Sequence, residues 1–446
     1  MRAAEGAKVT ALAPRGLCWT NEPNPYTPMH MFTRIFPRFC VATLSLVAAC
    51  SSTTEPDTGK PGPTLDALPR ALTSGEQKVI GAANDFSFAL FRQLSAVRSD
   101  NNVFTSPLSA SMALGMAMNG AAGTTYDEMR STLGFDAGAT ETDIGTSYKS
   151  LITLLRGLDP SVDFRIANSI WYRTGFPVEP AFLDANRNWF DAQASALDFA
   201  SPTAVPTINN WVSTSTAGKI PTILDDTRGE QVMFLINAIY FKGSWRTKFD
   251  PARTVDAPFK GVAGDQPTKL MHRDGMIRHL QAADFAAVDL PYGNSAYSMT
   301  VVLPNEGKSV DAVAASLQSA AWAGWMGQFH HADVDLYLPR FKLEWQRMLI
   351  PDLQALGMRA AFVDGGADFS RMSSLGRQLF ISLVKQKTYV DVNEEGTEAA
   401  AVTNVGISLT SMPARSTFRV DRPFVFVIRE RLSGTILFMG KIVRMP

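Results

Sequence analysis

Two short groups of serine, lysine and asparagine side chains have spacings that catalytic sites use. Ser382 and Lys385 fit the pattern S-x-x-K, and Ser99–Asn101 reads S-D-N. Together with a K-T-G motif, such groups form the acylating site of penicillin-recognising hydrolases. Here their order along the chain is reversed, no K-T-G follows, and Ser382 lies in an alternating, strand-like stretch. We therefore assign both matches to chance and do not expect the protein to be an enzyme.

The histidines offer no better site. They show no H-E-x-x-H spacing, and no G-x-S-x-G motif supplies a serine partner. Two of them are adjacent in the sequence, and neighbouring residues of a strand point to opposite faces, so the pair would not converge on one ion. The sequence thus predicts no metal and no other cofactor. The five histidines are His30, His272, His279, His330 and His331.

The most informative pattern lies between Thr388 and Phe424. Thr388–Val392 alternates like a strand, and from Thr397 onward every second residue is small, β-branched or aliphatic. Alternation with one buriable face is what a strand needs. The stretch up to Pro423 is nevertheless long for a loop of a compact domain, and such loops usually carry function or are disordered. The buriable set is Thr397, Ala399, Ala401, Thr403, Val405, Ile407 and Leu409.

A helix over Glu394–Val402 is the alternative interpretation, because Glu and Ala favour helices. Gly396 and the β-branched residues after Ala401 argue against a long helix. We therefore expect a segment that can become a strand but is a weak strand on its own.

Residues 393–403, NEEGTEAAAVT, resemble the hinge of the reactive-centre loop of inhibitory serpins. Other segments resemble the same family in the family's order and together cover essentially all of residues 74–446. They are NVFTSPLSASMALGMAMNGAAGTT (102–125), IANSIWYRTGFPVEPAF (166–182), LDF (197–199), INNWVSTSTAGKIPTIL (208–224), INAIYFKGSWRTKF (236–249), LPY (290–292), SMTVVLP (298–304), LPRF (338–341) and DRPFVFVI (421–428).

The resemblance implies an α+β fold, with helices around large antiparallel β-sheets and an exposed reactive-centre loop. It also implies a suicide-substrate inhibitor of serine-type endopeptidases. The protease attacks the loop and becomes acylated, and the cut loop inserts into the main sheet before water resolves the ester. A non-inhibitory serpin that acts as a carrier is the alternative. The small, alanine-rich hinge argues against it, because loss of insertion would tolerate bulky or charged residues there.

Several residues acquire roles only through this resemblance. Ser106 and Ser109 match the shutter under the opening of the sheet, and Asn237 matches their amide partner. Trp245 matches the aromatic residue where insertion begins. Gln386 stands where many serpins have histidine; it can bridge Ser and Asn by hydrogen bonds but cannot become cationic. The hinge comprises Glu394, Glu395, Gly396, Thr397, Glu398, Ala399, Ala400, Ala401 and Thr403.

The family spacing counted from Gly396 places the reactive bond between Thr410 and Ser411. Counting back from Pro423 gives Met412, and Leu409 is a further alternative. None of these residues is basic, so we expect elastase-, chymotrypsin- or subtilisin-like targets rather than trypsin-like ones. Arg415 is the only nearby basic residue and comes late in the loop.

Periodicity supplies the elements that would position this loop. Apolar residues at helical spacing predict helices first, and β-branched or alternating runs predict strands later, which favours an α+β class with large antiparallel sheets. The expected helices are Ser74–Val97, Ser106–Asn119 and Thr207–Thr216, the last with Trp211 facing inward. The expected strands are Val232–Phe241, Ser298–Leu303, Val334–Leu338, Phe424–Ile428 and Ile436–Ile442.

Composition sets the broad limits. The chain has 446 residues, 46% of them hydrophobic, and a net charge of zero. That is ordinary globular composition, and without a dense run of Lys and Arg we expect no nucleic-acid partner. We expect a monomer. All three cysteines, Cys18, Cys40 and Cys50, lie in the first fifty residues, so residues 51–446 can hold no disulfide.

The first fifty residues resemble an export leader. Arg34 and Arg38 precede the apolar run Phe39–Ala49, which is too short to span a bilayer as a helix. VAAC at 47–50 resembles a lipoprotein box, so we expect lipidation at Cys50, with a plain signal peptide as the alternative and Met31 as a possible start. Residues 51–72 are expected to be a flexible tether and 73–446 one domain. The protein would then be lipid-anchored at the cell envelope or extracellular.

Overall fold

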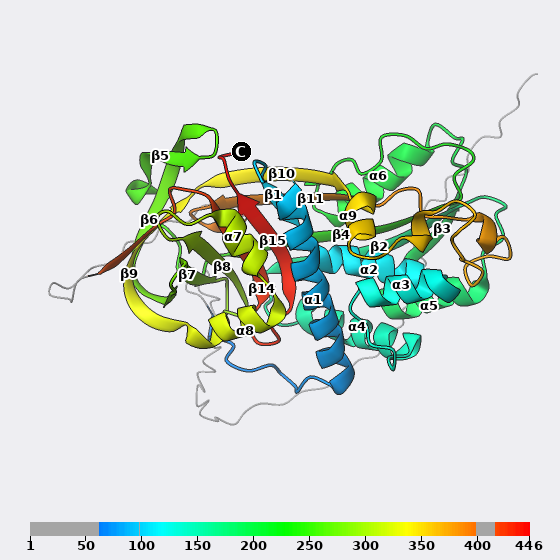
Figure 1. The fold of residues 1–446 in the computed structure, drawn as a ribbon, viewed down its shortest axis with the longest axis horizontal. Coiled ribbons are helices and arrows are strands. Elements are labelled where there is room, and N and C mark those ends of the chain that lie inside the picture. Colours follow the sequence, from blue (N-terminus) through cyan, green and yellow to red (C-terminus); the bar gives the residue numbers. More distant parts are fainter. Residues whose placement is uncertain (1–61, 98, 398–414) are drawn as a thin grey trace, which may run out of the picture. The chain divides into compact units, whose positions relative to one another are not determined.

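The computed structural model describes residues 62–97, 99–397 and 415–446. Helices gather in the first half of this part of the chain and strands dominate the second half (Figure 1). The α-helices are α1 (Ser74–Val97), α2 (Pro107–Met118), α3 (Gly123–Thr132), α4 (Glu141–Arg156), α5 (Pro180–Phe190), α6 (Ala204–Ser215), α7 (Val310–Ser316), α8 (Ser319–Gln328) and α9 (Ile350–Ala355).

The strands of the described residues form two sheets. A nine-stranded sheet has the order β1-β15-β14-β8-β7-β6-β9-β13, with β5 paired to β6, and a six-stranded sheet has the order β10-β11-β12-β4-β2-β3. Pairing is antiparallel except between β13 and β9 and between β2 and β3. The strands are β1 (Val103–Thr105), β2 (Asp163–Arg173), β3 (Gln193–Leu197), β4 (Met233–Ser244), β5 (Val255–Gly261), β6 (Gly264–Gln281), β7 (Phe285–Pro291), β8 (Tyr297–Pro304), β9 (His330–Pro339), β10 (Phe341–Met348), β11 (Lys385–Asn393), β12 (Gly396–Thr397), β13 (Ser416–Arg419), β14 (Phe424–Glu430) and β15 (Ile436–Ile442).

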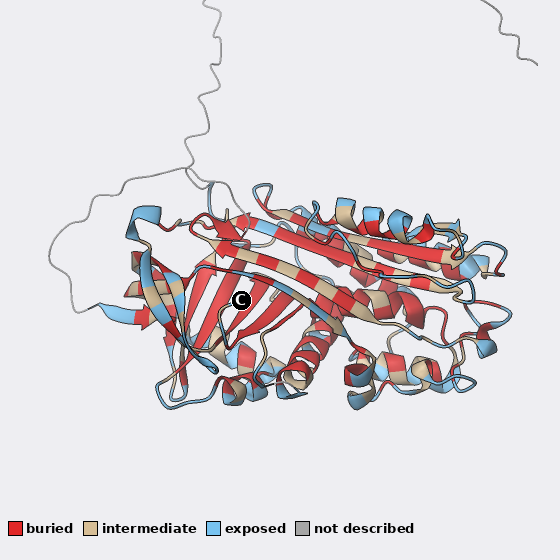
Figure 2. Cartoon of the chain, turned by 90° about the horizontal axis from the view of Figure 1, so that it is seen from above, coloured by how far each residue is buried: buried red, intermediate tan, exposed pale blue. Residues whose placement is uncertain are grey.

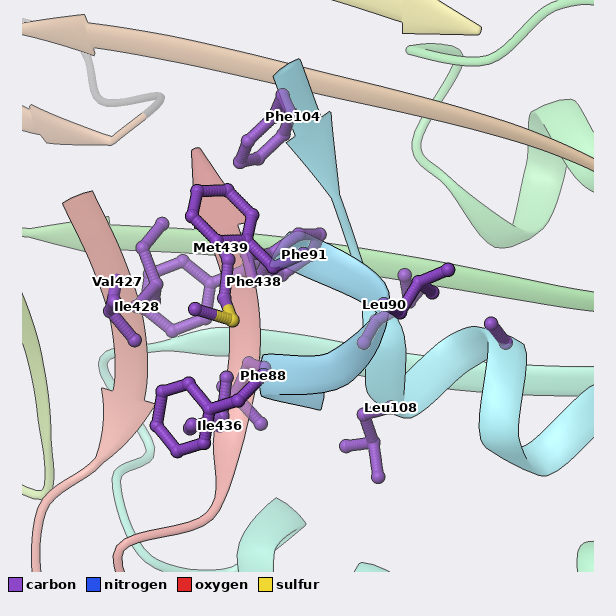
Figure 3. Close-up of a cluster of buried hydrophobic side chains, with 14 of the residues drawn as sticks. Phe88, Leu90, Phe91, Phe104, Leu108, Val427, Ile428, Ile436, Phe438 and Met439 are labelled. Carbon is purple, nitrogen blue, oxygen red and sulfur yellow. The ribbon is translucent and has the colours of Figure 1, made fainter. Parts of the chain in front are cut away.

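The principal core joins the helices to the nine-stranded sheet. Strands β8, β14 and β15 are buried along their whole length, and Figure 2 shows this sheet as largely buried. Side chains from α1 reach β1, β14 and β15 in the cluster of Figure 3. Phe104 stacks on Phe438 with ring centroids 5.3 Å apart. Continuous apolar strands of this kind are buried because both of their faces are covered.

Helix α2 lies against both sheets, contacting β4 of one and β15 of the other. It begins at Pro107, where the missing N–H costs nothing. Ser106 caps the helix, and its Oγ accepts a hydrogen bond from the Ser109 amide at 3.4 Å. Helix α6 contacts β2 and β4. Strand β4 consequently buries Ile239 and Phe241 in the main core and Phe234 and Ile236 in a smaller cluster with α6.

Most elements follow the sequence-based prediction. The predicted helix Ser74–Val97 matches α1, the predicted strand Val232–Phe241 begins one residue before β4, the other predicted strands fall within β8, β9, β14 and β15, and β11 contains Thr388–Val392. One expectation was wrong: Ser382 precedes β11 and is not in a strand. Trp211 faces the smaller core cluster as expected, although it is only half-buried: it packs edge-on against Trp171 and donates its indole N–H to Gln193 Oε1 at 3.1 Å.

Residues 62–72 belong to the stretch for which composition predicts a tether, yet this part packs on the domain. The Leu65 amide donates to the Asn294 carbonyl at 2.8 Å. Leu65, Leu68 and Leu72 contact the main core, and Arg70 pairs with the buried Glu76 at the start of α1. Burial of these three leucines stabilises the packed arrangement of this segment, although the residues before it are polar.

Neither a membrane-spanning helix nor a metal-binding cluster is present in the described part of the chain. No helix there has the length and apolar character needed to cross a bilayer. No group of three or more His, Cys, Asp or Glu side chains there could hold a metal ion.

Candidate functional site: the hinge and the slot in the six-stranded sheet

The two residues of β12 lie between β4 and β11. Thr397 pairs with Gly243 of β4 and with Val392 of β11, and Gly396 pairs with Ser244 and Asn393, all antiparallel. The start of the predicted hinge is therefore already a strand of the sheet.

Only glycine fits at position 396. A Cβ atom there would lie 2.1 Å from the carbonyl oxygen of Gly243 and 2.7 Å from the Cα of Ser244, and the backbone has a φ of +154°. Because both contacts are with backbone, neither neighbour can move aside cheaply. The glycine lets the chain turn from β11 into the space beside β4.

The side chain of Thr397 is enclosed at the same point. Thr397 is 2% exposed, and its Oγ1 lies 2.7 Å from the hydroxyl of Tyr292. Burial of Tyr292 raises the pKa of its phenol well above the usual value, so this hydroxyl stays neutral. Trp245 stacks on the Tyr292 ring, with centroids 4.5 Å apart. We call Gly396, Thr397, Trp245 and Tyr292 the hinge site.

Backbone hydrogen bonds and contacts of two carboxylates hold the turn at Glu394 and Glu395, which leads from β11 into β12. The amides of Trp245 and Phe249 donate to the carbonyls of Glu395 and Glu394, at 2.8 and 2.9 Å. The Trp245 indole N–H donates to the Asn393 carbonyl at 2.9 Å. The two carboxylates are also held: Thr254 Oγ1 donates to Glu394 at 2.8 Å, and Lys248 Nζ lies 2.6 Å from Glu395.

Beyond the hinge site the two strands separate. Residues 233–242 of β4 pair with β2, and residues 385–391 of β11 pair with β10, but in the part of the chain that the structure describes no strand pairs with their facing edges. We call this space the slot. It holds a cavity of about 170 Å³, closed by α2 on one side and lined also by residues 379–384. A second hollow continues from it past Leu224 and Lys385.

The shutter residues line this cavity but do not form the bridge that the sequence suggested. Ser109, Asn237 and Gln386 all face it. Gln386 Oε1 accepts from Thr105 Oγ1 at 2.6 Å and from the Ser106 amide at 3.1 Å, and its Nε2 donates to the Ser106 carbonyl at 2.7 Å. Gln386 therefore fastens β11 to the start of α2.

Asn237 is bonded elsewhere. Its Nδ2 donates to Asn168 Oδ1 on β2 at 2.6 Å, and its own Oδ1 is buried without a hydrogen-bond partner among the described residues. The expected bridge from Gln386 to Asn237 is wrong for this state, because β4 and β11 stand apart across the slot and the Gln386 amide is already engaged by Thr105 and Ser106.

The structure brings further residues to the candidate site that sequence reasoning overlooked. Tyr292 ends the LPY motif, which was recognised as a family segment but given no role. Thr105 donates to Gln386, and Asn168 accepts from Asn237, and no spacing in the sequence marks either residue. Only the family motif could have drawn attention to Tyr292.

Part of the predicted site lies outside the described residues. This holds for Glu398, Ala399, Ala400, Ala401 and Thr403 of the hinge, for the candidate reactive-bond residues Leu409, Thr410, Ser411 and Met412, and for Cys50.

Comparison with known proteins finds relatives along most of the chain. A family model described as serpin (serine protease inhibitor) matches residues 81–445. The leukocyte elastase inhibitor of Xenopus laevis is 34% identical over 377 residues, which are 82% of this chain and 99% of the relative. An uncharacterized serpin-like protein of Thermococcus kodakarensis is 32% identical over 404 residues, covering 88% of this chain and 92% of the relative.

Solved structures show the same fold. The native state of tengpin, a thermophilic serpin, superposes with a TM-score of 0.76 at 30% identity, covering 86% of this chain and 97% of that one. Human thyroxine-binding globulin with its ligand gives a TM-score of 0.76 at 28% identity and covers 83% of this chain and 100% of that one. The expected α+β serpin fold is confirmed, and the chain belongs to the serpin family.

Proposed function

We propose that this protein is a suicide-substrate inhibitor of serine-type proteases, which it traps by inserting its cut loop into the slot. The observation that carries the proposal is β12: the hinge residues Gly396 and Thr397 are already paired on both sides, and the slot continues from them. Serpins inhibit proteases rather than catalyse reactions, so we do not assign an enzyme activity.

The register of β12 says where each following residue would go. If the inserted strand kept this register along both neighbours, Ala399 would lie between Phe241 and Val390, and Thr403 would lie between Asn237 and Gln386. The small side chains at alternate positions would meet little steric resistance, and the Thr403 hydroxyl would reach Asn237 Oδ1, which lacks a partner among the described residues.

The driving force can be sized from backbone pairing alone. Inserting about ten residues between two strand edges adds on the order of twenty ladder hydrogen bonds, because each residue offers one N–H and one C=O, and at roughly 0.5–1.5 kcal/mol each the gain is on the order of 10–30 kcal/mol. That is comparable to, or larger than, the whole stability of an ordinary domain. The uncut protein would therefore be metastable and held by a kinetic barrier.

The target class follows from the loop and from the relatives. No residue between 409 and 412 is basic, and the first relative above is named an inhibitor of leukocyte elastase. Both support proteases that cut after aliphatic or small residues. We propose Thr410–Ser411 as the reactive bond, with cleavage after Leu409 or Met412 as the neighbouring alternatives, and a monomeric inhibitor.

The test is to mix the protein with elastase-, chymotrypsin-, subtilisin- and trypsin-like enzymes and to run denaturing gels. We expect an adduct that survives denaturation with one of the first three, and mass spectrometry of the released peptide gives the bond. The same protease with its serine chemically blocked is the control and should form no adduct. Clean cleavage by every enzyme without an adduct would contradict inhibition and favour the carrier function that a relative of thyroxine-binding globulin could have.

We further propose that the inhibitor acts outside the cytoplasm, anchored through a lipid on Cys50. The leader-like residues 1–50 support this proposal. Cys50→Ala should move the protein from the membrane fraction to the soluble fraction, because one or more acyl chains supply the anchoring energy. A wild-type protein found only in the soluble fraction would contradict it.

A further inference from the structure

The only basic residue between Thr397 and Ser416 is Arg415, and the structure does not leave it free. Arg415 directly precedes β13, whose residues Ser416–Arg419 pair with β9. Its Nε donates to Asp333 Oδ2 on β9 at 2.9 Å, and its Nη1 lies 2.6 Å from Asp274 Oδ2 on β6. The guanidinium thus reaches across one strand to the next.

The surroundings of the Asp274 and Asp333 carboxylates favour binding of a cation. Asp274 and Asp333 are largely enclosed, with side chains 16% and 10% exposed. The other oxygen of Asp274 accepts from Arg253 at 2.6 Å, so this carboxylate is fixed before Arg415 reaches it. Hydrogen bonding by Arg253, aided by the charge of Arg415, lowers the pKa of Asp274, so that it stays ionised at neutral pH.

An arginine-specific protease must take the whole guanidinium into its own acidic pocket before it can cut. To do so at Arg415 it would first have to break both ion pairs and lift the backbone at Ser416 from β9. We propose that Asp274 and Asp333 clamp Arg415 and thereby exclude arginine-specific proteases from the bait segment. The inference rests on the proposed function for its meaning, since it decides which proteases the bait can engage.

The clamp would decide whether a protease cuts the loop after Arg415 or at the proposed reactive bond. Hydrolysis of the Arg415–Ser416 bond adds water, leaving a carboxylate on Arg415 and an amine on Ser416. A cut there lies well beyond the proposed reactive bond, between Thr410 and Ser411. With the clamp in place, only proteases that accept the uncharged residues before Arg415 find a usable bond.

The experiment uses the full-length protein and trypsin at neutral pH, with mass spectrometry to follow the fragment that begins at Ser416. We expect the double variant Asp274→Asn/Asp333→Asn to be cut at this bond at least about tenfold faster than the wild type, because an amide cannot form the ion pair. Asp335→Asn is the matched control: Asp335 lies on the same face of β9 but bonds His272. We expect its rate at Arg415 to stay at the wild-type value.

A variant of Arg415 guards against misfolding of the double variant. Arg415→Lys keeps every carboxylate and remains a trypsin site, but its single ammonium cannot bridge two carboxylates as the planar fork does. We expect it to be cut several-fold faster than the wild type. Equal rates in wild type and in both variants, with native circular dichroism, would overturn the clamp. The assay reads cleavage and not trapping, so it stands even if no protease is inhibited.

Discussion

The hinge site and the slot lie along the same two strands, yet they are built in opposite ways. At the hinge site β12 pairs with both neighbours, Thr397 bonds Tyr292, and Trp245 stacks on the same ring. In the slot, the described residues supply no strand between the facing edges. A cavity lies there, and Asn237 Oδ1 has no partner in the described part of the chain.

This difference suggests that the two regions have separate roles in loop insertion: one affects its rate and the other its driving force. Insertion from the hinge site must begin with Gly396 and Thr397, which already occupy the entrance, so a change that dislodges them would delay its start. Each later residue of an inserting loop would gain backbone hydrogen bonds and fill the slot, where the described residues place no strand. We infer that the entrance controls how soon insertion starts, whereas the slot determines how much free energy is released.

The largest expected effect comes from blocking the entrance. Thr397→Arg would bury a guanidinium beside Tyr292 without a carboxylate, at a cost of several kcal/mol. We expect trapping to fall by on the order of 100-fold and the protein to be cut as a plain substrate. The ratio of adduct to cleaved protein on denaturing gels measures this. Thr397→Ser keeps the hydroxyl and should trap normally; equal trapping by the arginine variant would contradict a role for position 397.

Loss of the aromatic stack should come next. Trp245→Ala removes the ring that covers Tyr292 and the indole N–H bonded to Asn393. We expect the free energy of unfolding of the uncut protein to fall by about 3–5 kcal/mol, as for other large buried aromatic residues. Urea unfolding followed by fluorescence of the remaining tryptophans measures it. Trp245→Phe should recover most of the loss, and a decrease below about 1 kcal/mol for the alanine variant would show that the stack is incidental.

A smaller loss is expected from the slot wall. Gln386→Ala leaves the Ser106 amide and Thr105 Oγ1 without the Gln386 Oε1 acceptor, which should cost about 1–3 kcal/mol of unfolding free energy. Gln346→Ala makes the same chemical change at an exposed position of β10 and should stay within about 0.5 kcal/mol of the wild type. Equal effects of the two changes would mean that Gln386 does not fasten β11 to α2.

The smallest effect should be a gain. Ala113 of α2 lines the cavity, so Ala113→Leu would fill space that the inserted loop is meant to use. We expect the uncut protein to become more stable by up to about 1 kcal/mol and trapping to slow several-fold. Thermal melting and adduct kinetics test both. Ala323→Leu, at an exposed position of α8, is the control and should change neither; destabilisation by Ala113→Leu would mean that the slot has no room.

The sequence predicts the elements better than their contacts. Helix α1 and strands β8, β14 and β15 follow from apolar periodicity, which depends on neighbouring residues alone. The family resemblance assigned Gly396 and Thr397 to the hinge, and the structure places both in the sheet. The resemblance could not show that β12 is already in the sheet. That pairing depends on β4, whose residues Gly243 and Ser244 are more than a hundred positions away in the sequence.

Side-chain pairing was the least predictable feature. Several residues can satisfy one amide, so the sequence could not tell that Gln386 bonds Thr105 and Ser106 while Asn237 turns to Asn168. Tyr292 belongs to a family motif, but the sequence gives no reason for its presence there; the structure shows that its hydroxyl lies beside Thr397. In both places geometry, not composition, selects the partner.

The central claim is that the cut loop becomes a strand between β4 and β11. A crystal structure of the protein nicked at its reactive bond tests it most directly. Our account predicts continuous density for residues 398–409 in the slot, with Thr403 between Asn237 and Gln386. Density for those residues on the outside, with the slot still open in a correctly nicked molecule, would contradict it.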